Sequence, residues 1–320
     1  MKEVGLIGLG NAGRPIAERL LKKGYRLKVY DLNPEPMNAL SELGATKAAS
    51  ARESVSEITF TVLPSSKEVK AAVFGENGVL AAIQPGFVLL DLSGTDPRFA
   101  RELEVEVENR RAHFLGATLH AAGAPAVTIP KGLLSIVVGG KKEALEICLG
   151  ILKDLSRKVI CVPEPWMPKA MKIAVIMFAA ANSIISAEVF SWLTAQGLDP
   201  KLFHQLLKTT GSRESAGRVE DFLKRMNSHG GALSNSYKDI RQALEIAGLL
   251  NLPLPFMNTV NQLQEMGRAQ GLTRLNTPAA MGRLYEILTG QDLSGAVAAS
   301  ERVFPEPGEP EVIYLDGFKT

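Results

Sequence analysis

The sequence predicts an α/β fold in which a Rossmann-like, doubly wound amino-terminal domain precedes an all-helical carboxy-terminal domain. Three observations support this prediction. Short aliphatic runs alternate with amphipathic stretches up to about residue 162, a pattern typical of a parallel sheet with crossover helices. The glycine motif GLGNAG directly follows the first aliphatic run. From about Pro165 onward only helical patterns remain.

In the first half of the chain the expected strands and helices follow one another in regular order. Each expected strand is short, rich in Val, Ile and Leu, and bounded by Gly, Pro or Ser. The expected strands are residues 3–8, 26–31, 58–63, 87–93 and 158–162. The expected helices between them are residues 18–23, 66–74, 97–110 and 141–155.

The second half reads as successive helices that are interrupted by glycine and proline. Breaks are expected at residues 197–200, 211–212 and 230–231 and at Pro253. The change of pattern marks a domain boundary, so we expect domains at residues 1–164 and 165–300. The proline-rich residues 301–320 are expected to form an extended tail that packs on the surface or on a partner chain.

The second domain is expected to open with a long apolar helix, PKAMKIAVIMFAAANSIISAEVF, at residues 168–190. Its length raises the question of a membrane span. Asn182, Ser183, Ser186 and Glu188 interrupt the apolar run, so we expect a buried helix of a soluble protein. Such a helix also offers more apolar surface than one small domain covers, which favours a homodimer or homotetramer.

Composition excludes several classes of function. The chain has 320 residues, of which 46% are hydrophobic, and its 36 Lys and Arg against 34 Asp and Glu give a charge of only +2. Nucleic acid is therefore not an expected partner. Cys148 and Cys161 lie in apolar surroundings, and His113, His204 and His229 lack metal-ligand spacing, so neither a disulfide framework nor a metal is expected. The amino terminus contains charge and glycine where a signal peptide needs an apolar run, so we expect a cytoplasmic protein that binds no membrane.

The motif GLGNAG matches GxGxxG between an expected strand and an expected helix. In a dinucleotide site Gly8 permits the tight turn, Gly10 lets the backbone approach the pyrophosphate, and Gly13 lets helix and strand pack closely. The helix terminus then receives the anion. The expected contacts with the pyrophosphate are Gly8, Leu9, Gly10, Asn11, Ala12 and Gly13.

Asp31 ends the second expected strand, eighteen residues after Gly13, where it can accept hydrogen bonds from an adenosine ribose. Its carboxylate would repel a 2′-phosphate, and no arginine follows in Leu32-Asn33-Pro34. NAD is therefore favoured over NADP. An ordinary glycine turn with an unrelated aspartate is the competing interpretation, and the strand and helix on either side of the motif disfavour it.

Several further segments together resemble the β-hydroxyacid dehydrogenase family, which includes 3-hydroxyisobutyrate dehydrogenases and tartronate semialdehyde reductases and is similar to 6-phosphogluconate dehydrogenase. VLPSS at 62–66 looks like the family's loop after a central strand, and DLSGTDP at 91–97 is similar to its DxST segment. YKDIRQALEIA at 237–247 resembles its KDL segment. The resemblance implies that the cofactor also contacts Leu63, Pro64, Ser65, Gly94 and Lys238.

The same resemblance aligns Lys172 with the family's catalytic lysine, and Gly197-Leu198-Asp199-Pro200 with the end of its interdomain helix. Oxidation of a hydroxy acid requires a base for the hydroxyl proton, and reduction requires the same group as an acid. A lysine serves both directions, and burial in an apolar cleft disfavours its charged form. A lysine that extends to solvent is the alternative interpretation, and Lys169 is the competing lysine.

Three departures from the family pattern predict an unusual substrate. Ile176 stands where the family has an asparagine, and Gly123-Ala124-Pro125 replaces its glycine-rich substrate loop, in which Pro125 cannot donate an N–H. The stiff segment 163–168 replaces a glycine-rich approach to the helix. We expect a substrate that is larger or less polar near Ile176. The expected substrate contacts are Ser93, Gly94, Gly123, Ala124, Pro125 and Ile176.

Three further side chains are candidates for the same site. His120, in the altered loop, can supply a hydrogen bond or a proton relay, although loop histidines more often only pack. Arg213 and Arg218 can pair with a carboxylate or phosphate, although a solvated helix face is the commoner role.

These observations favour an NAD-dependent enzyme that interconverts a hydroxy acid and its aldehyde or keto form, with Lys172 as general acid and base. The first alternative is an imine reductase-like enzyme. Imine reductases generally prefer NADPH and lack this lysine, so Asp31 and Lys172 count against it. The second alternative is a dinucleotide-binding module without turnover, which the altered substrate loop suggests.

Overall fold

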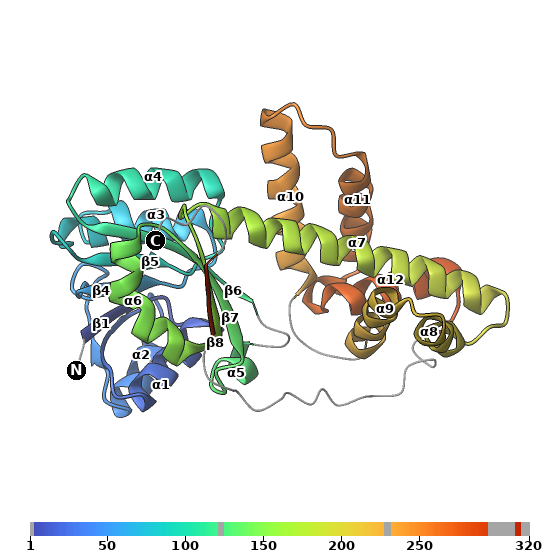
Figure 1. Ribbon diagram of the computed structural model, residues 1–320, viewed down its shortest axis with the longest axis horizontal. Helices are drawn as coiled ribbons and strands as arrows, with labels where there is room; N and C mark the ends of the chain where they lie inside the picture. Colours follow the sequence, from blue (N-terminus) through green and yellow to red (C-terminus); the bar gives the residue numbers. More distant parts are fainter. Residues whose placement is uncertain (1–2, 121–124, 227–231, 294–310, 315–320) are drawn as a thin grey trace. The chain divides into compact units, whose positions relative to one another are not determined.

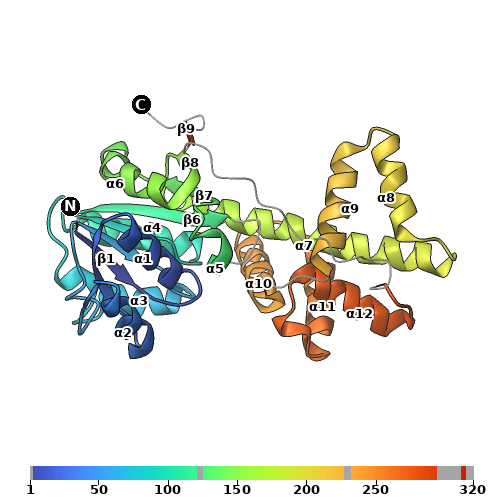
Figure 2. The same ribbon diagram turned by 90° about the horizontal axis from the view of Figure 1, so that it is seen from below.

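The computed structural model describes residues 3–120, 125–226, 232–293 and 311–314 (Figures 1 and 2). Contacts divide the chain into two units, residues 1–172 with 305–320, and residues 173–304. The first unit contains a largely parallel sheet covered by helices, and the described part of the second contains helices without a named strand. The predicted fold class, a Rossmann domain followed by a helical domain, is confirmed.

The sheet has the strand order β3-β2-β1-β4-β5-β6-β7-β8-β9. All neighbouring strands are parallel except β6 and β7, which pair in antiparallel fashion. Because β1 lies between β2 and β4, the order of the strands reverses there, and ligands of such sheets bind at the carboxyl ends of the strands beside this reversal. The strands are β1 (Glu3–Ile7), β2 (Arg26–Tyr30), β3 (Thr46–Lys47), β4 (Ile58–Thr61), β5 (Val88–Asp91), β6 (His113–His120), β7 (Leu134–Gly139), β8 (Ser156–Val162) and β9 (Glu311–Tyr314).

Two hydrophobic cores cover the two faces of this sheet. Helices α1, α2 and α6 contribute to one core, and α3 and α4 to the other. Because the central strands β4 and β5 are buried on both faces, they read as continuous apolar runs rather than as alternating ones. The helices of this unit are α1 (Gly13–Lys22), α2 (Pro34–Glu42), α3 (Ser66–Phe74), α4 (Pro97–Glu108), α5 (Pro125–Thr128) and α6 (Lys142–Leu155), with the 3-10 turn Val79–Ala81.

The five predicted strands occur as β1, β2, β4, β5 and β8, and the four predicted helices as α1, α3, α4 and α6. The sequence did not predict β3, β6, β7, β9, α2 and α5. Strand β6 was missed because it has histidine at both ends and Gly116 in its middle, and glycine is depleted in strands. A Cβ atom on Gly116 would lie 1.9 Å from the carbonyl oxygen of Pro165, so this glycine is required by close packing.

Helix α7 (Met167–Ala195) runs from the end of the first unit into the second. It ends before the predicted Gly197–Pro200 break, and Asp199 caps the next helix by accepting a 2.8 Å bond from Lys201 N. The second unit has its own core. Its other helices are α8 (Pro200–Thr209), α9 (Arg213–Met226), α10 (Leu233–Leu249), α11 (Pro255–Ala269) and α12 (Thr277–Thr289), with the 3-10 turn Leu272–Arg274.

One side of α7 is exposed, so the expectation of a buried helix is not met within the single chain. Only 39% of its most apolar window is buried, and by length and hydropathy alone the helix also meets the requirement for a membrane span. In the tail, β9 pairs in parallel with β8 at the edge of the sheet. Cys148 and Cys161 are buried free thiols, as expected.

Candidate functional site

The predicted pyrophosphate cradle lies in the turn between β1 and α1, at the reversal of strand order. Two of its glycines are required by the fold itself. Gly8 has φ +94°, and a Cβ atom on Gly13 would lie 1.9 Å from the carbonyl oxygen of Gly8. A Cβ atom on Gly10 would meet no atom of the chain within 4 Å. The open space above Gly10 is therefore where a bound anion can approach the backbone.

The amino terminus of α1 fits such an anion. Ala12 precedes the helix and provides no side-chain hydrogen bond to cap it, and the first turn contains no acidic residue. Backbone N–H groups of a first helical turn lack partners within the helix, and the helix dipole makes this end positive. The residues present thus fit the pyrophosphate of a dinucleotide.

Asp31 ties the end of β2 to this turn. Its Oδ2 accepts a 2.6 Å bond from Leu9 N, and its Oδ1 accepts a 2.8 Å bond from Asn33 N. A carboxylate has about four acceptor positions, so lone pairs remain for ribose hydroxyls. A second negative charge at the same place, as in a 2′-phosphate, is disfavoured by repulsion. This geometry supports NAD, as the sequence predicted.

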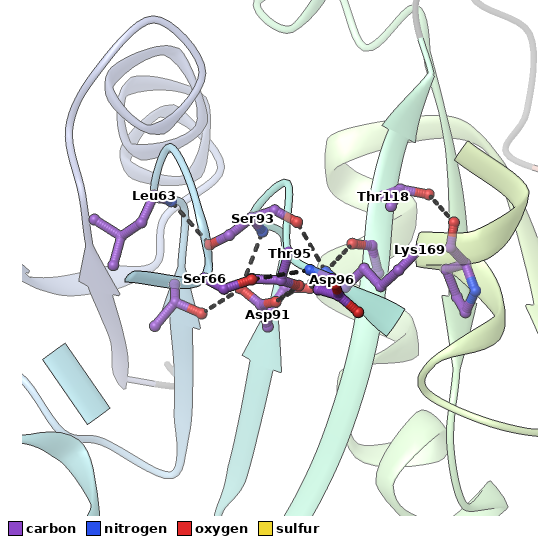
Figure 3. Close-up of polar contacts among 11 residues, drawn as sticks. Leu63, Ser66, Asp91, Ser93, Thr95, Asp96, Thr118 and Lys169 are labelled. Atoms are coloured by element: carbon purple, nitrogen blue, oxygen red, sulfur yellow. Dashed lines mark hydrogen bonds and ion pairs between the residues drawn. The ribbon is translucent and has the colours of Figure 1, made fainter. Parts of the chain in front are cut away.

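A buried ion pair lies at the carboxyl end of β5 (Figure 3). Asp91 Oδ2 is 2.9 Å from Lys169 Nζ, and both side chains are 0% exposed. Thr61 and Thr95 donate hydroxyl hydrogen bonds of 2.8 and 2.9 Å to the same carboxylate, and Ser93 N donates one of 3.0 Å. Burial alone would raise the pKa of Asp91, but the Lys169 charge and the hydrogen bonds from Ser93 and Thr61 lower it below its ordinary value.

The ammonium of Lys169 is enclosed by oxygen atoms. Besides Asp91 Oδ2, its Nζ lies 2.9 Å from each of the carbonyl oxygens of Asp91, Ser93 and Ala117. Burial lowers the pKa of Lys169, and the Asp91 carboxylate opposes that effect. A neutral amine would direct its lone pair at one of these oxygens, so the charged form fits this environment. Lys169 is therefore poorly placed to exchange a proton with a substrate.

Further hydrogen bonds join the loop at 62–66 to the loop at 91–97, the two loops that were predicted to hold cofactor and substrate. Ser93 Oγ accepts a 2.9 Å bond from Leu63 N, and Ser66 Oγ accepts a 2.9 Å bond from Asp96 N (Figure 3). Ser65 caps α3 by accepting a 3.2 Å bond from Lys67 N. The Ser93 side chain also hydrogen-bonds to the Asp91 carboxylate, which contributes to the lowered pKa of Asp91.

Lys172 is partly exposed and lies in the first unit. Its charge acts on His120, the last residue of β6. Burial, and then the charge of Lys172, lower the pKa of His120, so this imidazole is neutral at pH 7. His120 Nε2 is 3.1 Å from Thr118 Oγ1, which in turn donates to the carbonyl oxygen of Pro168 at 3.4 Å. The two candidates Lys172 and His120 therefore lie in one neighbourhood at the carboxyl edge of the sheet.

The stiff segment before α7 lies directly on the sheet. Cβ atoms on Gly116 and Gly139 would lie 1.9 Å from Pro165 O and 2.1 Å from Glu164 O. The Arg101 guanidinium covers the ring of Trp166, with its central carbon 4.2 Å from the ring centroid. The two glycines let this segment approach β6 and β7, so it delivers the first turn of α7 to the sheet in a fixed position.

The remaining predicted substrate contacts are Gly123, Ala124, Pro125 and Ile176. Gly123 and Ala124 lie outside the residues that the structure describes. Pro125 begins α5, where a helix needs no N–H donor. Ile176 packs against the core of the second unit. Its contact with a substrate stays a prediction.

The other candidates from the second unit are engaged by neighbours on their own helices or on α7. Lys238 Nζ is 3.6 Å from Asp239 Oδ1, and its contact with a cofactor stays a prediction. Arg218 lies over the ring of Phe178, 5.0 Å from its centroid, and 3.7 Å from Glu214, as expected for a surface helix. The side chain of Arg213 is outside the described residues. Within the described residues, no group of three His, Cys, Asp or Glu side chains forms a metal site.

Comparisons with known proteins match both units. The profile of the NAD-binding domain of 6-phosphogluconate dehydrogenase matches residues 3–163. The profile described as the NAD-binding domain of NADP-dependent 3-hydroxyisobutyrate dehydrogenase matches residues 168–284. The 2-(hydroxymethyl)glutarate dehydrogenase of Eubacterium barkeri is 28% identical over 300 residues, which are 92% of this chain and 98% of that protein.

Solved structures share the fold. The 3-hydroxyisobutyrate dehydrogenase of Mycobacterium tuberculosis, solved with L-serine, has a TM-score of 0.77 at 22% identity and covers 89% of this chain and 99% of its own. An imine reductase from Myxococcus stipitatus with NADP+ has a TM-score of 0.57 at 18% identity, with coverages of 88% and 98%. At these identities the likenesses establish the fold alone.

Proposed function

The chain belongs to the β-hydroxyacid dehydrogenase family of NAD(P)-dependent oxidoreductases, and we propose that it interconverts a hydroxy acid and the corresponding aldehyde or keto acid with NAD. One structural observation supports this activity in addition to membership of the family. Lys172 lies beside neutral His120 at the carboxyl edge of a sheet whose β1–α1 turn fits a dinucleotide. Lys169, the competing lysine, is fully buried among four oxygens.

The proposed chemistry divides into a proton and a hydride. Bound NAD supplies the hydride acceptor. Lys172 takes the proton from the substrate hydroxyl during oxidation and returns it to the carbonyl oxygen during reduction. Ser93, whose oxygen accepts a hydrogen bond from Leu63 N, contacts the substrate from the 91–97 loop. His120 donates or accepts one further hydrogen bond beside Lys172 without adding a charge.

The proposed substrate is a hydroxy acid with an aliphatic substituent. Ile176 replaces a polar family side chain, so the substrate has no amide partner at that position. A missing polar partner favours substrates without a hydroxyl or amine there, because an unpaired polar group in a closed site costs free energy. The E. barkeri relative is named for a substituted, longer dicarboxylic substrate, which agrees with a pocket that accepts more than the smallest hydroxy acids.

A panel of hydroxy acids of graded length, each assayed with NAD and with NADP, tests the proposal. We expect an absorbance increase at the nicotinamide wavelength with branched or longer 3-hydroxy acids and NAD, and tighter binding of NADH than of NADPH in a fluorescence titration. Tighter binding of NADPH would contradict the role of Asp31. Reduction of cyclic imines in place of any hydroxy acid turnover would favour the imine reductase alternative. Tight NADH binding with no turnover on the whole panel would favour a non-catalytic module.

We further propose that the enzyme is a cytoplasmic homodimer or homotetramer in which a second copy covers the exposed side of α7. Val175, Phe178, Ile185 and Trp192 are 53%, 58%, 48% and 63% exposed. Their spacing of three or seven residues puts them on one side of a helix, as in the seam of a helix pair. Asn182 lies in the same stripe and Glu188 is exposed on this helix, which suits a protein partner better than lipid.

Phe178→Asp is expected to shift the protein toward monomers in sedimentation velocity at micromolar concentration. A buried charge in place of an aromatic interface residue weakens association by about 2 kcal/mol or more, roughly 30-fold. Val105→Asp on α4 is the matched control, because Val105 and Phe178 are both 58% exposed. A monomeric wild-type protein would refute the proposal, and wild-type protein that stays soluble only with detergent would indicate a membrane instead.

A further inference from the structure

Lys169 lies in the first turn of α7, three residues before Lys172. It does not act as an acid or base in the proposed reaction. Three residues along an α-helix correspond to a rise of about 4.5 Å and a rotation of roughly 300°, so the two lysines lie toward the same side of the helix. The charge of Lys172 also contributes to lowering the pKa of Lys169, in agreement with this helical spacing. A shift of the turn that holds Lys169 therefore moves Lys172 with it.

The oxygens around Lys169 come from two neighbouring strands and the loop between β5 and α4. Asp91 is the last residue of β5, Ser93 lies in the following loop, and Ala117 lies in β6. Through Asp91 the network reaches Thr61 at the end of β4, and through Ser93 it reaches Leu63. One ammonium thus fastens the start of α7 to both loops that line the predicted cofactor site (Figure 3).

Stability alone is a weak reason for this arrangement. Removing two charges from water costs several kcal/mol for each ion, and apolar pairs of similar volume often replace buried ion pairs without loss of stability. A buried pair does impose one geometry, because its partners must meet at hydrogen-bond distance. Each of the four Lys169 contacts is 2.9 Å long, so the position of the helix turn is defined from several directions.

We propose that Lys169 is a positioning residue whose ion pair with Asp91 sets the location of Lys172 relative to the 91–97 loop and so determines kcat. This inference rests on the proposed function, in which Lys172 exchanges a proton with the substrate. Lys169 itself touches neither substrate nor cofactor. Its effect is transmitted by the rigid first turn of α7, and a displacement of about 1 Å in a catalytic group is enough to lower a rate roughly 100-fold.

Two variants separate positioning from stability. Lys169→Met removes the ammonium and leaves the Asp91 carboxylate buried without its cation, which is expected to lower both the thermal midpoint and kcat. Lys169→Met/Asp91→Asn removes both charges and is expected to regain most of the thermal midpoint, because no unpaired buried charge remains. Its kcat, measured well below the midpoint, is expected to stay about 100-fold below that of the wild type. Its Kd for NADH is expected to rise much less than kcat falls, because Gly8, Gly10 and Asp31 are unchanged although the loops at 62–66 and 91–97 lose their anchor.

Recovery of stability without recovery of kcat supports the proposal. Recovery of both would show that the pair only stabilises the fold, and wild-type kcat in either variant would overturn the inference. If Lys169→Met does not fold, the double variant carries the test alone. Lys153→Met, an exposed lysine on α6, is the matched control and is expected to leave kcat and the midpoint unchanged.

A readout without turnover keeps this test separate from the proposed function. Amide hydrogen exchange in residues 62–66, 91–97 and 167–172 is expected to rise together in the double variant and not in Lys153→Met. Unchanged exchange in these three segments would overturn the inference even if no substrate is found. Conversely, increased exchange in a protein that turns over no hydroxy acid would leave the anchoring role intact and refute the proposed function instead.

Discussion

Lys172→Ala is expected to lower kcat by about 100- to 10,000-fold, the usual contribution of a general acid or base. NADH binding is expected to be retained, because the cradle at Gly8–Gly13 and the ribose acceptor Asp31 belong to other elements of the sheet. The two measurements are steady-state turnover with the best hydroxy acid of the panel and a fluorescence titration with NADH. A large change in kcat with an unchanged Kd identifies a group that acts in the chemical step.

Added primary amines provide a chemical control for this variant. If the missing group is the proton acceptor, methylamine is expected to restore part of the turnover of Lys172→Ala in proportion to its free-base concentration. Lys201→Ala removes an exposed lysine from α8 and is expected to behave as the wild type. Full turnover of Lys172→Ala would refute the proposed mechanism, and Lys169 offers no substitute because its ammonium is enclosed by four oxygens.

The sequence identified the parts of this molecule whose signals are local. Strands that are buried on both faces, such as Ile58–Thr61, appear as uninterrupted apolar runs, and the glycine turn lies between a strand and a helix as its motif requires. Strand β6 was not predicted because Gly116 interrupts its strand pattern. This glycine is required by a close contact with Pro165, which lies far along the chain. The exposed side of α7 was not predicted, because an apolar run does not show which faces of the helix are covered by the same chain.

The Asp91–Lys169 pair could not be predicted for a related reason. Its partners are 78 positions apart, and each residue alone has an ordinary interpretation as a strand-end carboxylate or a surface lysine. A signal does exist in the strand itself. Asp91 follows the buried residues Val88, Leu89 and Leu90, and a carboxylate drawn into such surroundings requires a cation or several hydrogen bonds. The sequence thus indicates that a partner is needed, and only the fold shows which one.

Gly10→Val is expected to weaken NADH binding by about 100-fold, or ~2.7 kcal/mol, while the thermal midpoint of the protein without ligand stays close to that of the wild type. Gly10 is exposed, a Cβ atom there meets nothing within 4 Å, and its φ is outside the left-handed range. The chain itself therefore has no steric need for glycine at this position. The remaining reason is a ligand that passes close to the backbone, as the pyrophosphate does in this type of turn.

Gly13→Ala is the matched comparison, since its Cβ atom would collide with the carbonyl oxygen of Gly8 at 1.9 Å. That variant is expected to lose thermal stability as well as NADH affinity, because β1 and α1 must separate to admit the methyl group. Thermal scans with and without NADH distinguish the two. A ligand at 100 times its Kd raises stability by about 2.7 kcal/mol, and at the same NADH concentration this increment is expected to fall to about 0.4 kcal/mol in Gly10→Val. A Gly10→Val protein that keeps the full increment would mean that the dinucleotide does not cross the turn at Gly10, and the cradle assignment would then be wrong although the fold stands.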